Sequence, residues 1–183
     1  MRIISGKARG TKLYSLEGST TRPTLDRVKE SLFNIIQNRV PECTFLDLFS
    51  GSGAIGLEAA SRGANKTILC EKNKAAISII KKNIEKTHLE DKVKLYENSY
   101  ENLLNTINEK FDIIYIDPPY KTDFAYEATK LILKNNLLNE KGTIIIETDE
   151  EERIIKQIEK LEIEIVNRRK YGRVHLVFLE KWD

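Results

Sequence analysis

Cysteine is scarce in this sequence, and no metal-binding pattern is present. The two cysteines, Cys43 and Cys70, form no CxxC pair, and the only histidines, His88 and His175, stand far from each other in the chain. This spacing excludes a disulfide framework and a zinc-finger type of site. We therefore expect two small buried cysteines and a protein without a metal ion.

Long apolar runs are also missing. No apolar stretch approaches the roughly 18 residues of a membrane-spanning helix, and the opening residues MRIISGKARG lack the apolar core of a secretory signal. These absences exclude a membrane protein and a secreted one. We expect a cytoplasmic protein.

The overall charge is small but unevenly distributed. Thirty Lys and Arg face 28 Asp and Glu, a net charge of +2. Residues 1–40, however, hold eight basic residues against three acidic ones, which leaves +5. The basic ones are Arg2, Lys7, Arg9, Lys12, Arg22, Arg27, Lys29 and Arg39. Such a local excess favours contact with a polyanion.

The 183 residues are enough for one domain with a substantial core, but not for a second large recognition domain. We expect a single domain over residues 1–183, in which residues 1–40 form a β-hairpin and a helix appended to a sheet built from residues 41–183. The hairpin strands are expected at 2–5 and 11–14. Thr24 is expected to cap a helix from Leu25 to about Arg39.

From residue 44 onward, short apolar runs alternate with amphipathic segments of helical length, which is typical of a parallel α/β sheet. Strands are expected at 44–49, 66–71, 93–97, 111–117 and 142–147. Helices are expected at 53–62, 74–87, 100–108, 124–136 and 150–160. Two last strands, at 162–167 and 174–180, are separated only by RRKYGR and predict a closing β-hairpin.

A glycine-rich loop follows the first of these strands. In DLFSGSGAIG, Gly51, Gly53 and Gly56 satisfy the GxGxxG pattern, which brings a ligand close to backbone amides at a helix N-terminus. About twenty residues later, the second strand ends at Glu71, whose carboxylate could accept hydrogen bonds from both hydroxyls of a ribose. The pattern indicates an adenosine-containing cofactor, and on its own it fits NAD equally well.

Asp47 separates the two cofactor types, because it stands at the end of the strand just before the glycine loop. A dinucleotide would place its anionic pyrophosphate there, and the two negative charges would repel each other. A cofactor with an ammonium group and a positive sulfonium would be attracted instead. A purely structural role, as a cap of the following helix, remains the alternative for Asp47.

The fourth parallel strand, FDIIYID, runs directly into Pro118, Pro119 and Tyr120. Two prolines end the strand and make the following loop rigid, with carbonyl groups left unpaired. The Asp117 carboxylate and the Pro118 carbonyl could accept the hydrogens of an exocyclic amine and direct its lone pair at a methyl group. Tyr120 offers a face on which a planar base can stack. The alternative is a proline turn that merely ends a buried strand.

Together these motifs resemble the Rossmann-like amino-methyltransferases, and the resemblance to one family covers essentially the whole chain. The segments RIISGKARGTKL, TRPTLDRVKESLFN, DLFSGSGAIGLEAASRGA and the closing KYG hairpin are similar to the RsmD family. That family transfers a methyl group from S-adenosylmethionine to the N2 amine of one guanine in 16S ribosomal RNA. The resemblance implies a seven-stranded sheet with an antiparallel last strand and helices on both faces.

The resemblance also implies roles for individual residues. Chemistry would take place at Asp117, Pro118, Pro119 and Tyr120, and the TRPT segment would close over the cofactor. Asn98 or Ser99, after the third strand, would bind the adenine amino group, with Asn98 preferred. The full set of expected cofactor-binding residues is Asp47, Ser50, Gly51, Gly53, Glu71, Asn98, Ser99, Thr21, Arg22, Pro23 and Thr24.

The basic residues fit a nucleic-acid partner, which the resemblance implies to be ribosomal RNA or a 30S particle, with the target base in a loop or a partly assembled particle. The expected RNA-binding residues are Arg2, Lys7, Arg9, Lys12, Arg22 and Arg27. Arg168, Arg169, Lys170 and Arg173 form a second basic cluster. We expect the protein to act as a monomer.

Other functions remain open from sequence alone. A DNA adenine-N6 or cytosine-N4 methyltransferase would use the same loop chemistry, but usually adds a recognition domain for which this chain has no room. In a protein-glutamine methyltransferase the loop typically begins with Asn, whereas this loop begins with Asp117. From other classes, an NAD-dependent oxidoreductase and a catalytically silent nucleotide-binding module are the alternatives.

Overall fold

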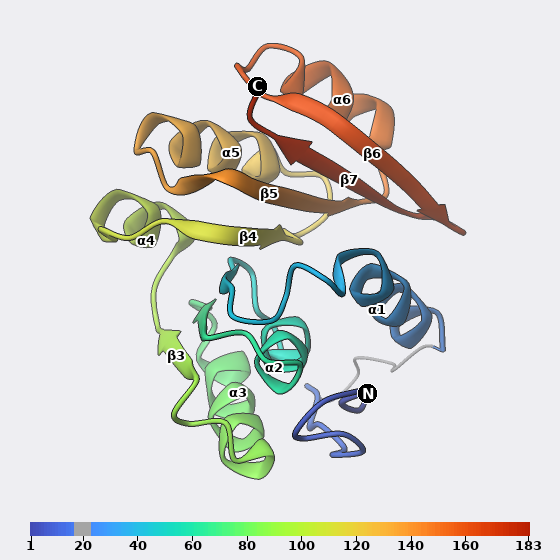
Figure 1. Ribbon diagram of the computed structural model, residues 1–183, viewed down its shortest axis with the longest axis vertical. Coiled ribbons are helices and arrows are strands. Elements are labelled where there is room, and N and C mark those ends of the chain that lie inside the picture. Colours follow the sequence, from blue (N-terminus) through green and yellow to red (C-terminus); the bar gives the residue numbers. More distant parts are fainter. Residues whose placement is uncertain (17–22) are drawn as a thin grey trace.

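The computed structural model describes residues 1–16 and 23–183 of the chain. Within them, one seven-stranded sheet has the order β3-β2-β1-β4-β5-β7-β6 (Figure 1). The strands are β1 (Thr44–Asp47), β2 (Lys66–Cys70), β3 (Val93–Tyr96), β4 (Phe111–Ile116), β5 (Leu138–Thr148), β6 (Glu164–Tyr171) and β7 (Val174–Glu180). The helices are α1 (Pro23–Ile36), α2 (Ala54–Ser61), α3 (Lys74–Thr87), α4 (Tyr100–Thr106), α5 (Phe124–Lys134) and α6 (Glu151–Ile158).

Strands β1 to β5 are parallel, whereas β7 is antiparallel to both of its neighbours, β5 and β6. The predicted closing hairpin is therefore present, and its second strand enters the sheet between β5 and β6. This order confirms the predicted Rossmann-like sheet with an antiparallel last strand. It also puts the carboxyl ends of β1, β4 and β5 next to one another at one edge, where ligands bind in such sheets.

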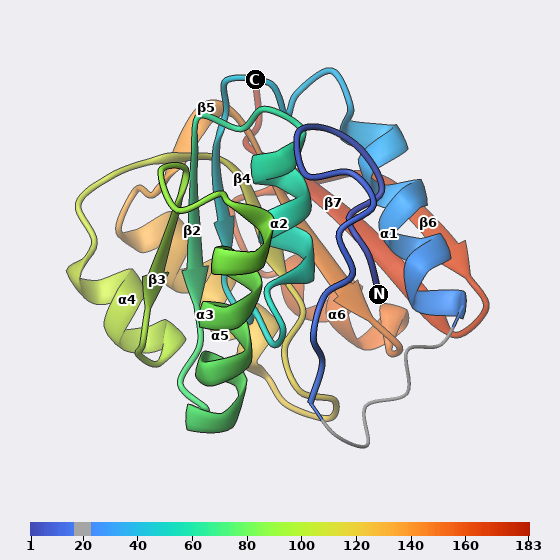
Figure 2. The same ribbon diagram turned by 90° about the horizontal axis from the view of Figure 1, so that it is seen from below.

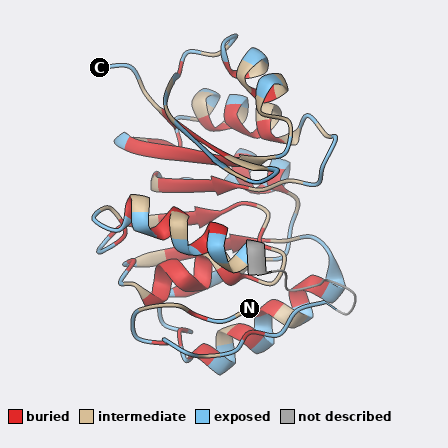
Figure 3. Ribbon diagram, turned by 90° about the vertical axis from the view of Figure 1, so that its right-hand side faces the viewer, coloured by how far each residue is buried: buried red, intermediate tan, exposed pale blue. Residues whose placement is uncertain are grey.

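Each face of the sheet has its own helices, because side chains alternate along a strand. Phe45, Ile113 and Tyr115 pack with α1 on one face, and α2 and α3 continue this layer. Leu46 and Ile114 point the other way, into the cluster formed with α4, α5 and α6. Both faces are covered, which is why the inner strands β1, β2, β4 and β7 are mostly buried (Figure 3), whereas the edge strands β3 and β6 are more exposed.

Several predicted boundaries were wrong, among them the start of β5, which begins at Leu138 and not at residue 142. Helix α1 begins at Pro23 and ends at Ile36, so Thr24 lies inside its first turn and is not its cap. Proline suits the first helical position, where its missing N–H group would have no helical partner. Strand β6 runs to Tyr171, beyond the predicted end at residue 167, because the chain turns only at Gly172, with φ of 63°.

The predicted N-terminal hairpin is not a two-stranded ribbon. Residues 1–16 form an irregular loop closed by one antiparallel bridge between Arg2 and Lys12. Backbone hydrogen bonds from Ile3 N to the Thr11 carbonyl (2.9 Å) and from Leu13 N to the Met1 carbonyl (2.8 Å) hold this loop together. We call residues 1–16 the N-terminal loop.

The N-terminal loop is part of the core and not an appendage. Ile3, Ala8 and Leu13 are buried against α2 and α3, and Figure 2 shows the loop running along α2. Glu58, which is fully buried in α2, accepts a hydrogen bond from Ile4 N (2.8 Å). An apparently detachable segment thus supplies part of the layer that covers the sheet.

Two further buried polar groups fasten the N-terminal loop. The Lys29 ammonium, on α1, donates to the Arg2 carbonyl (2.6 Å) and lies 3.7 Å from a Glu58 carboxylate oxygen. The Asn83 side chain, on α3, binds Tyr14 N (2.7 Å) and also donates to the Ser52 carbonyl (2.9 Å) in the glycine-rich loop. The N-terminal loop and the glycine-rich loop are therefore held by the same side chain.

Candidate active site

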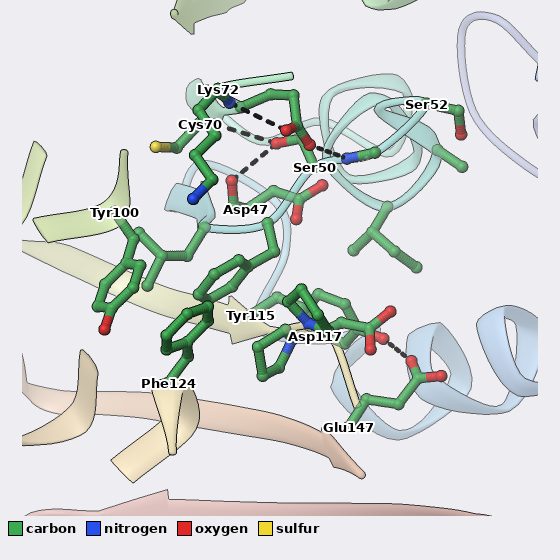
Figure 4. Close-up of a pocket in the computed structure, with 18 of the residues that line it drawn as sticks. Asp47, Ser50, Ser52, Cys70, Lys72, Tyr100, Tyr115, Asp117, Phe124 and Glu147 are labelled. Atoms are coloured by element: carbon green, nitrogen blue, oxygen red, sulfur yellow. Dashed lines mark hydrogen bonds between the residues drawn. The ribbon is translucent and has the colours of Figure 1, made fainter. Parts of the chain in front are cut away.

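A cavity of about 480 Å³ opens at the carboxyl edge of the parallel strands (Figure 4). Most of the residues expected from sequence line it, although they come from distant parts of the chain. They are Asp47, Ser50, Gly51, Glu71, Asn98, Ser99, Asp117, Pro118, Pro119 and Tyr120. The structure thus brings the predicted cofactor residues and the DPPY loop to one place.

The glycine-rich loop has the positive φ angles that its sequence suggests. Gly51 has φ of 57° and Gly53 has φ of 83°, a region that side chains with a Cβ rarely adopt. Gly51 borders the cavity, with open space where a Cβ would stand. Gly53 precedes α2 and does not line the cavity; a Cβ there would lie 3.4 Å from Leu57 and Leu69. Gly53 therefore shapes the loop, while Gly51 leaves room for a ligand.

Glu71 holds the glycine-rich loop in place. One of its carboxylate oxygens accepts a hydrogen bond from Gly51 N (2.9 Å), and the other accepts from Lys72 N and Asn73 N (both 2.9 Å). A carboxylate has about four acceptor sites, so these three bonds leave room for roughly one more donor. Backbone amides thus orient Glu71 at the cavity wall. If Glu71 binds two ribose hydroxyls, at least one of them has to share a carboxylate oxygen lone pair with a backbone amide.

Asp47 is fully buried at the carboxyl end of β1. Its carboxylate accepts a hydrogen bond from Gly56 N (3.1 Å) in the first turn of α2. Asp47 therefore does bind the N-terminal end of the following helix, which was the alternative role considered for it. Burial raises the pKa of Asp47 to about 7, although the Gly56 hydrogen bond lowers it, and the negative charges of Glu71 and Glu147 raise it further. A cation in the cavity would favour the ionised form.

Asp117 directly follows β4, and a second carboxylate lies beside it. Glu147, near the end of β5, lines the same cavity. Burial is the main reason that the pKa of Asp117 is raised well above its usual range, and the charges of Glu147 and Asp47 add to the effect. The pKa of Glu147 is also raised by burial, while the Tyr115 hydroxyl donates a hydrogen bond to its carboxylate and lowers it.

Glu147 was missed by the sequence analysis, which placed it in a strand without a role. Asp47, Asp117 and Glu147 stand at the ends of three adjacent strands, and all three project on the face covered by α1. The available signal in the sequence was an acidic residue at, or next to, the last residue of each of these strands. This cluster gives the cavity a wall of three carboxyl groups, whose pKa values are all raised.

Asn98 and Ser99 line the cavity, but both side chains already make local hydrogen bonds. The Asn98 side-chain oxygen accepts from Ser99 N (2.9 Å) and from the Asn102 amide (2.9 Å). The Ser99 hydroxyl caps α4 by accepting from Asn102 N (3.2 Å). The preference for Asn98 as adenine ligand stays a prediction, since a ligand would share this oxygen with two donors.

An aromatic wall completes one side of the cavity. The ring of Tyr100 lies 5.2 Å from that of Phe49 and 5.3 Å from that of Phe124, and Figure 4 shows Tyr100 and Phe124 next to each other. These rings offer a flat apolar surface of the kind that a nucleobase packs against. At the mouth, Tyr120 is 65 % exposed.

The segment expected to close over the cofactor is described only in part. Thr21 and Arg22 lie outside the described residues, and Pro23 and Thr24 are the first two residues of α1. The following turn does reach the cavity, where Leu25, Val28 and Lys29 form part of the lining together with Met1. The sequence analysis did not assign these cavity positions.

The expected RNA-binding residues of the N-terminal loop, Arg2, Lys7, Arg9 and Lys12, are all exposed, as is Arg27 on α1. They are not all close to the cavity. Lys7 N bonds to the Ser61 carbonyl at the far end of α2, roughly 12 Å along the helix from the glycine-rich loop. In the second basic cluster, Arg168, Arg169 and Lys170 lie in the last part of β6 and Arg173 lies in the turn before β7. This end of the hairpin is at the same edge as the cavity, because His175 pairs with Thr148.

Among residues 1–16 and 23–183, no group of three or more His, Cys, Asp or Glu side chains is arranged to hold a metal ion. A search of the same part of the chain finds no helix long and apolar enough to cross a membrane.

Comparison with known proteins gives consistent matches over most of the chain. Residues 1–180 match the family described as conserved hypothetical protein 95. The ribosomal RNA small subunit methyltransferase D of Haemophilus influenzae is 37 % identical over 85 % of this chain and 82 % of its own length. A solved structure of a hypothetical protein from Thermus thermophilus is 30 % identical, with a TM-score of 0.81 over 98 % of this chain and 99 % of that one. A ribosomal protein L11 methylase from Lactobacillus delbrueckii, 20 % identical, shares the fold with a TM-score of 0.70 over 84 % and 77 % of the two chains.

Proposed function

Because the chain belongs to the RsmD family of S-adenosylmethionine-dependent methyltransferases, we propose that it methylates the exocyclic N2 amine of a guanine in small-subunit ribosomal RNA. It would act as a monomer in the cytoplasm, on the RNA or on a 30S particle. The observation that carries this proposal is the position of the DPPY loop, which borders the same cavity as the glycine-rich loop. Methyl donor and target amine can meet only where these two loops meet.

The cavity suits S-adenosylmethionine in its charge and in its shape. Asp47 provides a buried carboxylate for a cation, Gly51 leaves backbone exposed, and the ring of Tyr100 lies in the aromatic wall for an adenine. When bound, this cofactor supplies an electrophilic methyl group. A dinucleotide would bring a pyrophosphate towards the carboxylates of Asp47 and Asp117, which disfavours the oxidoreductase alternative.

The DPPY loop would position the target amine. The Asp117 carboxylate and the Pro118 carbonyl accept its two hydrogens, so that the nitrogen lone pair points at the methyl group. As the nitrogen–carbon bond forms and the sulfur–carbon bond breaks, positive charge develops on nitrogen, and Asp117 stabilises it. The raised pKa of Asp117 also suits this carboxyl to take up the proton that the nitrogen then loses. Tyr120 at the cavity mouth stacks on the extruded base.

The test is transfer of a labelled methyl group to total RNA, DNA and isolated ribosomal subunits, followed by nucleoside analysis. We expect N2-methylguanosine from small subunits or their RNA. N6-methyladenine or N4-methylcytosine in DNA would replace this proposal by the DNA methyltransferase alternative. Binding of NAD in preference to S-adenosylmethionine would replace it by an oxidoreductase.

Replacing Glu71 with alanine is expected to weaken cofactor binding by about 1.5–3 kcal/mol, the contribution of hydrogen bonds to a charged group. Calorimetry with adenosine and with 2′,3′-dideoxyadenosine would separate the ribose contact from the bond to Gly51 N. The wild type should favour adenosine, and Glu71→Ala should bind both equally weakly. An unchanged preference for adenosine in the variant would disprove the ribose contact.

Cofactor affinity is expected to rise with pH between about 6 and 7.5. The pKa of Asp47 is about 7. A cation binds the ionised carboxylate better than the protonated one. Below this pKa, cofactor binding therefore releases a proton from Asp47, and the affinity increases by up to roughly ten-fold for each unit by which the pH rises. Asp47→Asn should flatten this dependence in calorimetric titrations. Equal slopes for both proteins would mean that Asp47 does not titrate with binding.

Neutralising Arg2, Lys7, Arg9 and Lys12 together is expected to flatten the salt dependence of RNA binding. Up to four phosphate contacts would be lost, with about 0.7 counterions released per contact on single strands. A matched control would neutralise four lysines that do not line the cavity: Lys110, Lys130, Lys134 and Lys160. Cofactor affinity should barely change in either variant. If the salt dependence of RNA binding has the same slope in the two variants, the N-terminal residues do not contact the RNA, and the cluster around Arg173 would have to bind it.

A further inference from the structure

Glu147 is a cavity carboxylate for which methyl transfer itself has no evident need. Strands β4 and β5 pair in register, with Ile116 opposite Ile146, so Asp117 and Glu147 follow at the same level on adjacent strands. Both project towards the side of the sheet that α1 covers. Figure 4 shows the two side chains close together in the cavity, with the Tyr115 hydroxyl between them and bonded to Glu147.

Two partly buried carboxylates next to each other are costly, since like charges repel and burial removes water from both. The Tyr115 hydroxyl, on a side chain that is 1 % exposed, binds one oxygen of Glu147 and orients it. Among the described residues, only that oxygen of the carboxylate, Oε2, takes part in a hydrogen bond. The other oxygen, Oε1, can therefore accept a hydrogen bond from a ligand in the cavity.

We propose that Glu147 accepts the N1–H of the target guanine while Asp117 and the Pro118 carbonyl accept the hydrogens of its N2 amine. This inference rests on the proposed function. In guanine, the ring N1–H stands directly beside the exocyclic amine, so neighbouring acceptors on β4 and β5 match neighbouring donors on one base edge. A charged acceptor makes such a bond stronger than a neutral one would.

The same arrangement would reject other amine-bearing bases. Beside the exocyclic amine, adenine and cytosine carry a ring nitrogen with a lone pair and no hydrogen, which would face the Glu147 carboxylate. A site that leaves a buried acceptor unpaired, or sets it against another acceptor, discriminates much more strongly than a difference in shape does. Glu147 is thus inferred to determine specificity, whereas Asp117 acts in the transfer.

2-Aminopurine tests this inference, because it keeps the amine at C2 but has a lone pair at N1. Small-subunit particles would be reconstituted with RNA that carries guanine or 2-aminopurine at the mapped target position. We expect wild-type protein to prefer guanine in kcat/KM by on the order of 10²-fold, the effect of losing a charge-assisted hydrogen bond. In Glu147→Gln the preference should fall to several-fold, since an amide can donate to the N1 lone pair.

Tyr115→Phe is the matched control, because it removes the hydroxyl that binds Glu147 but keeps the carboxylate. It should retain most of the preference for guanine, and both variants should bind S-adenosylmethionine within a few-fold of wild type. An unchanged preference in Glu147→Gln would overturn the role of Glu147. If the wild type methylates no guanine at all, the proposed function fails and this inference fails with it.

Discussion

Replacing Asp117 with alanine is expected to reduce methyl transfer by roughly 10²-fold or more, while S-adenosylmethionine binds within a few-fold of its wild-type affinity. The carboxylate is proposed to act on the amine as charge develops, and loss of one such acceptor in a transition state has an effect of this size. Single-turnover transfer to small subunits and calorimetric titration of the cofactor would measure the two quantities separately.

Asp123→Ala is the matched control for this experiment. Asp123 lies six positions further along the same segment, but its side chain is 60 % exposed and pairs with Arg153 outside the cavity. Its removal should leave methyl transfer unchanged within a few-fold. An equal loss of cofactor affinity in Asp117→Ala would instead assign Asp117 to the cofactor site.

The second large effect concerns stability. Glu58→Ala is expected to lower the free energy of unfolding by about 3–5 kcal/mol, because it leaves the Lys29 ammonium buried without its counter-charge. Both side chains are at most 1 % exposed, and the burial of Lys29 already lowers its pKa. The Ile4 amide would lose its acceptor as well. Urea denaturation, monitored by circular dichroism, would measure the difference in unfolding free energy between Glu58→Ala and the wild type.

An exposed ion pair provides the comparison. Arg39 and Glu180 are 2.7 Å apart, and each side chain is 37 % exposed. Glu180→Ala should cost no more than about 1 kcal/mol, since solvent screens such pairs. The loss of stability in Glu58→Gln should lie between the losses in Glu58→Ala and Glu180→Ala, because the amide oxygen can still accept a hydrogen bond from Ile4 N but carries no charge. Similar losses for Glu58→Ala and Glu180→Ala would show that the buried network does not support the fold.

The parallel sheet and most of its site could be predicted from sequence because the signals are local. Asp47 and Asp117 each end an apolar strand just before a glycine or proline loop, and these loops mark the carboxyl edge. Glu147 has no such marker. It stands in ETDEEE, where several acids follow one another, and only the register between β4 and β5 places it beside Asp117.

The role of the N-terminal loop could not be predicted, because it depends on contacts between distant residues. Glu58 and Asn83 lie in helices, where an isolated acid or amide is usually solvent-exposed. Both are fully buried, since backbone groups of the N-terminal loop supply their hydrogen-bond partners. The basic excess in residues 1–40 was visible in the sequence, but its anchoring was not. Removal of the N-terminal loop should therefore disturb the glycine-rich loop through Asn83.

The place of β7 in the sheet has a consequence for how the sheet assembles during synthesis. The seventh strand in chain order, Val174–Glu180, is not at the edge of the sheet but between β5 and β6. Until it has emerged, β5 has an open edge and β6 has no neighbour to pair with. Open edges of this kind promote association between chains. Premature termination before Val174 would therefore yield an aggregation-prone product, even though every residue lining the cavity had already been made.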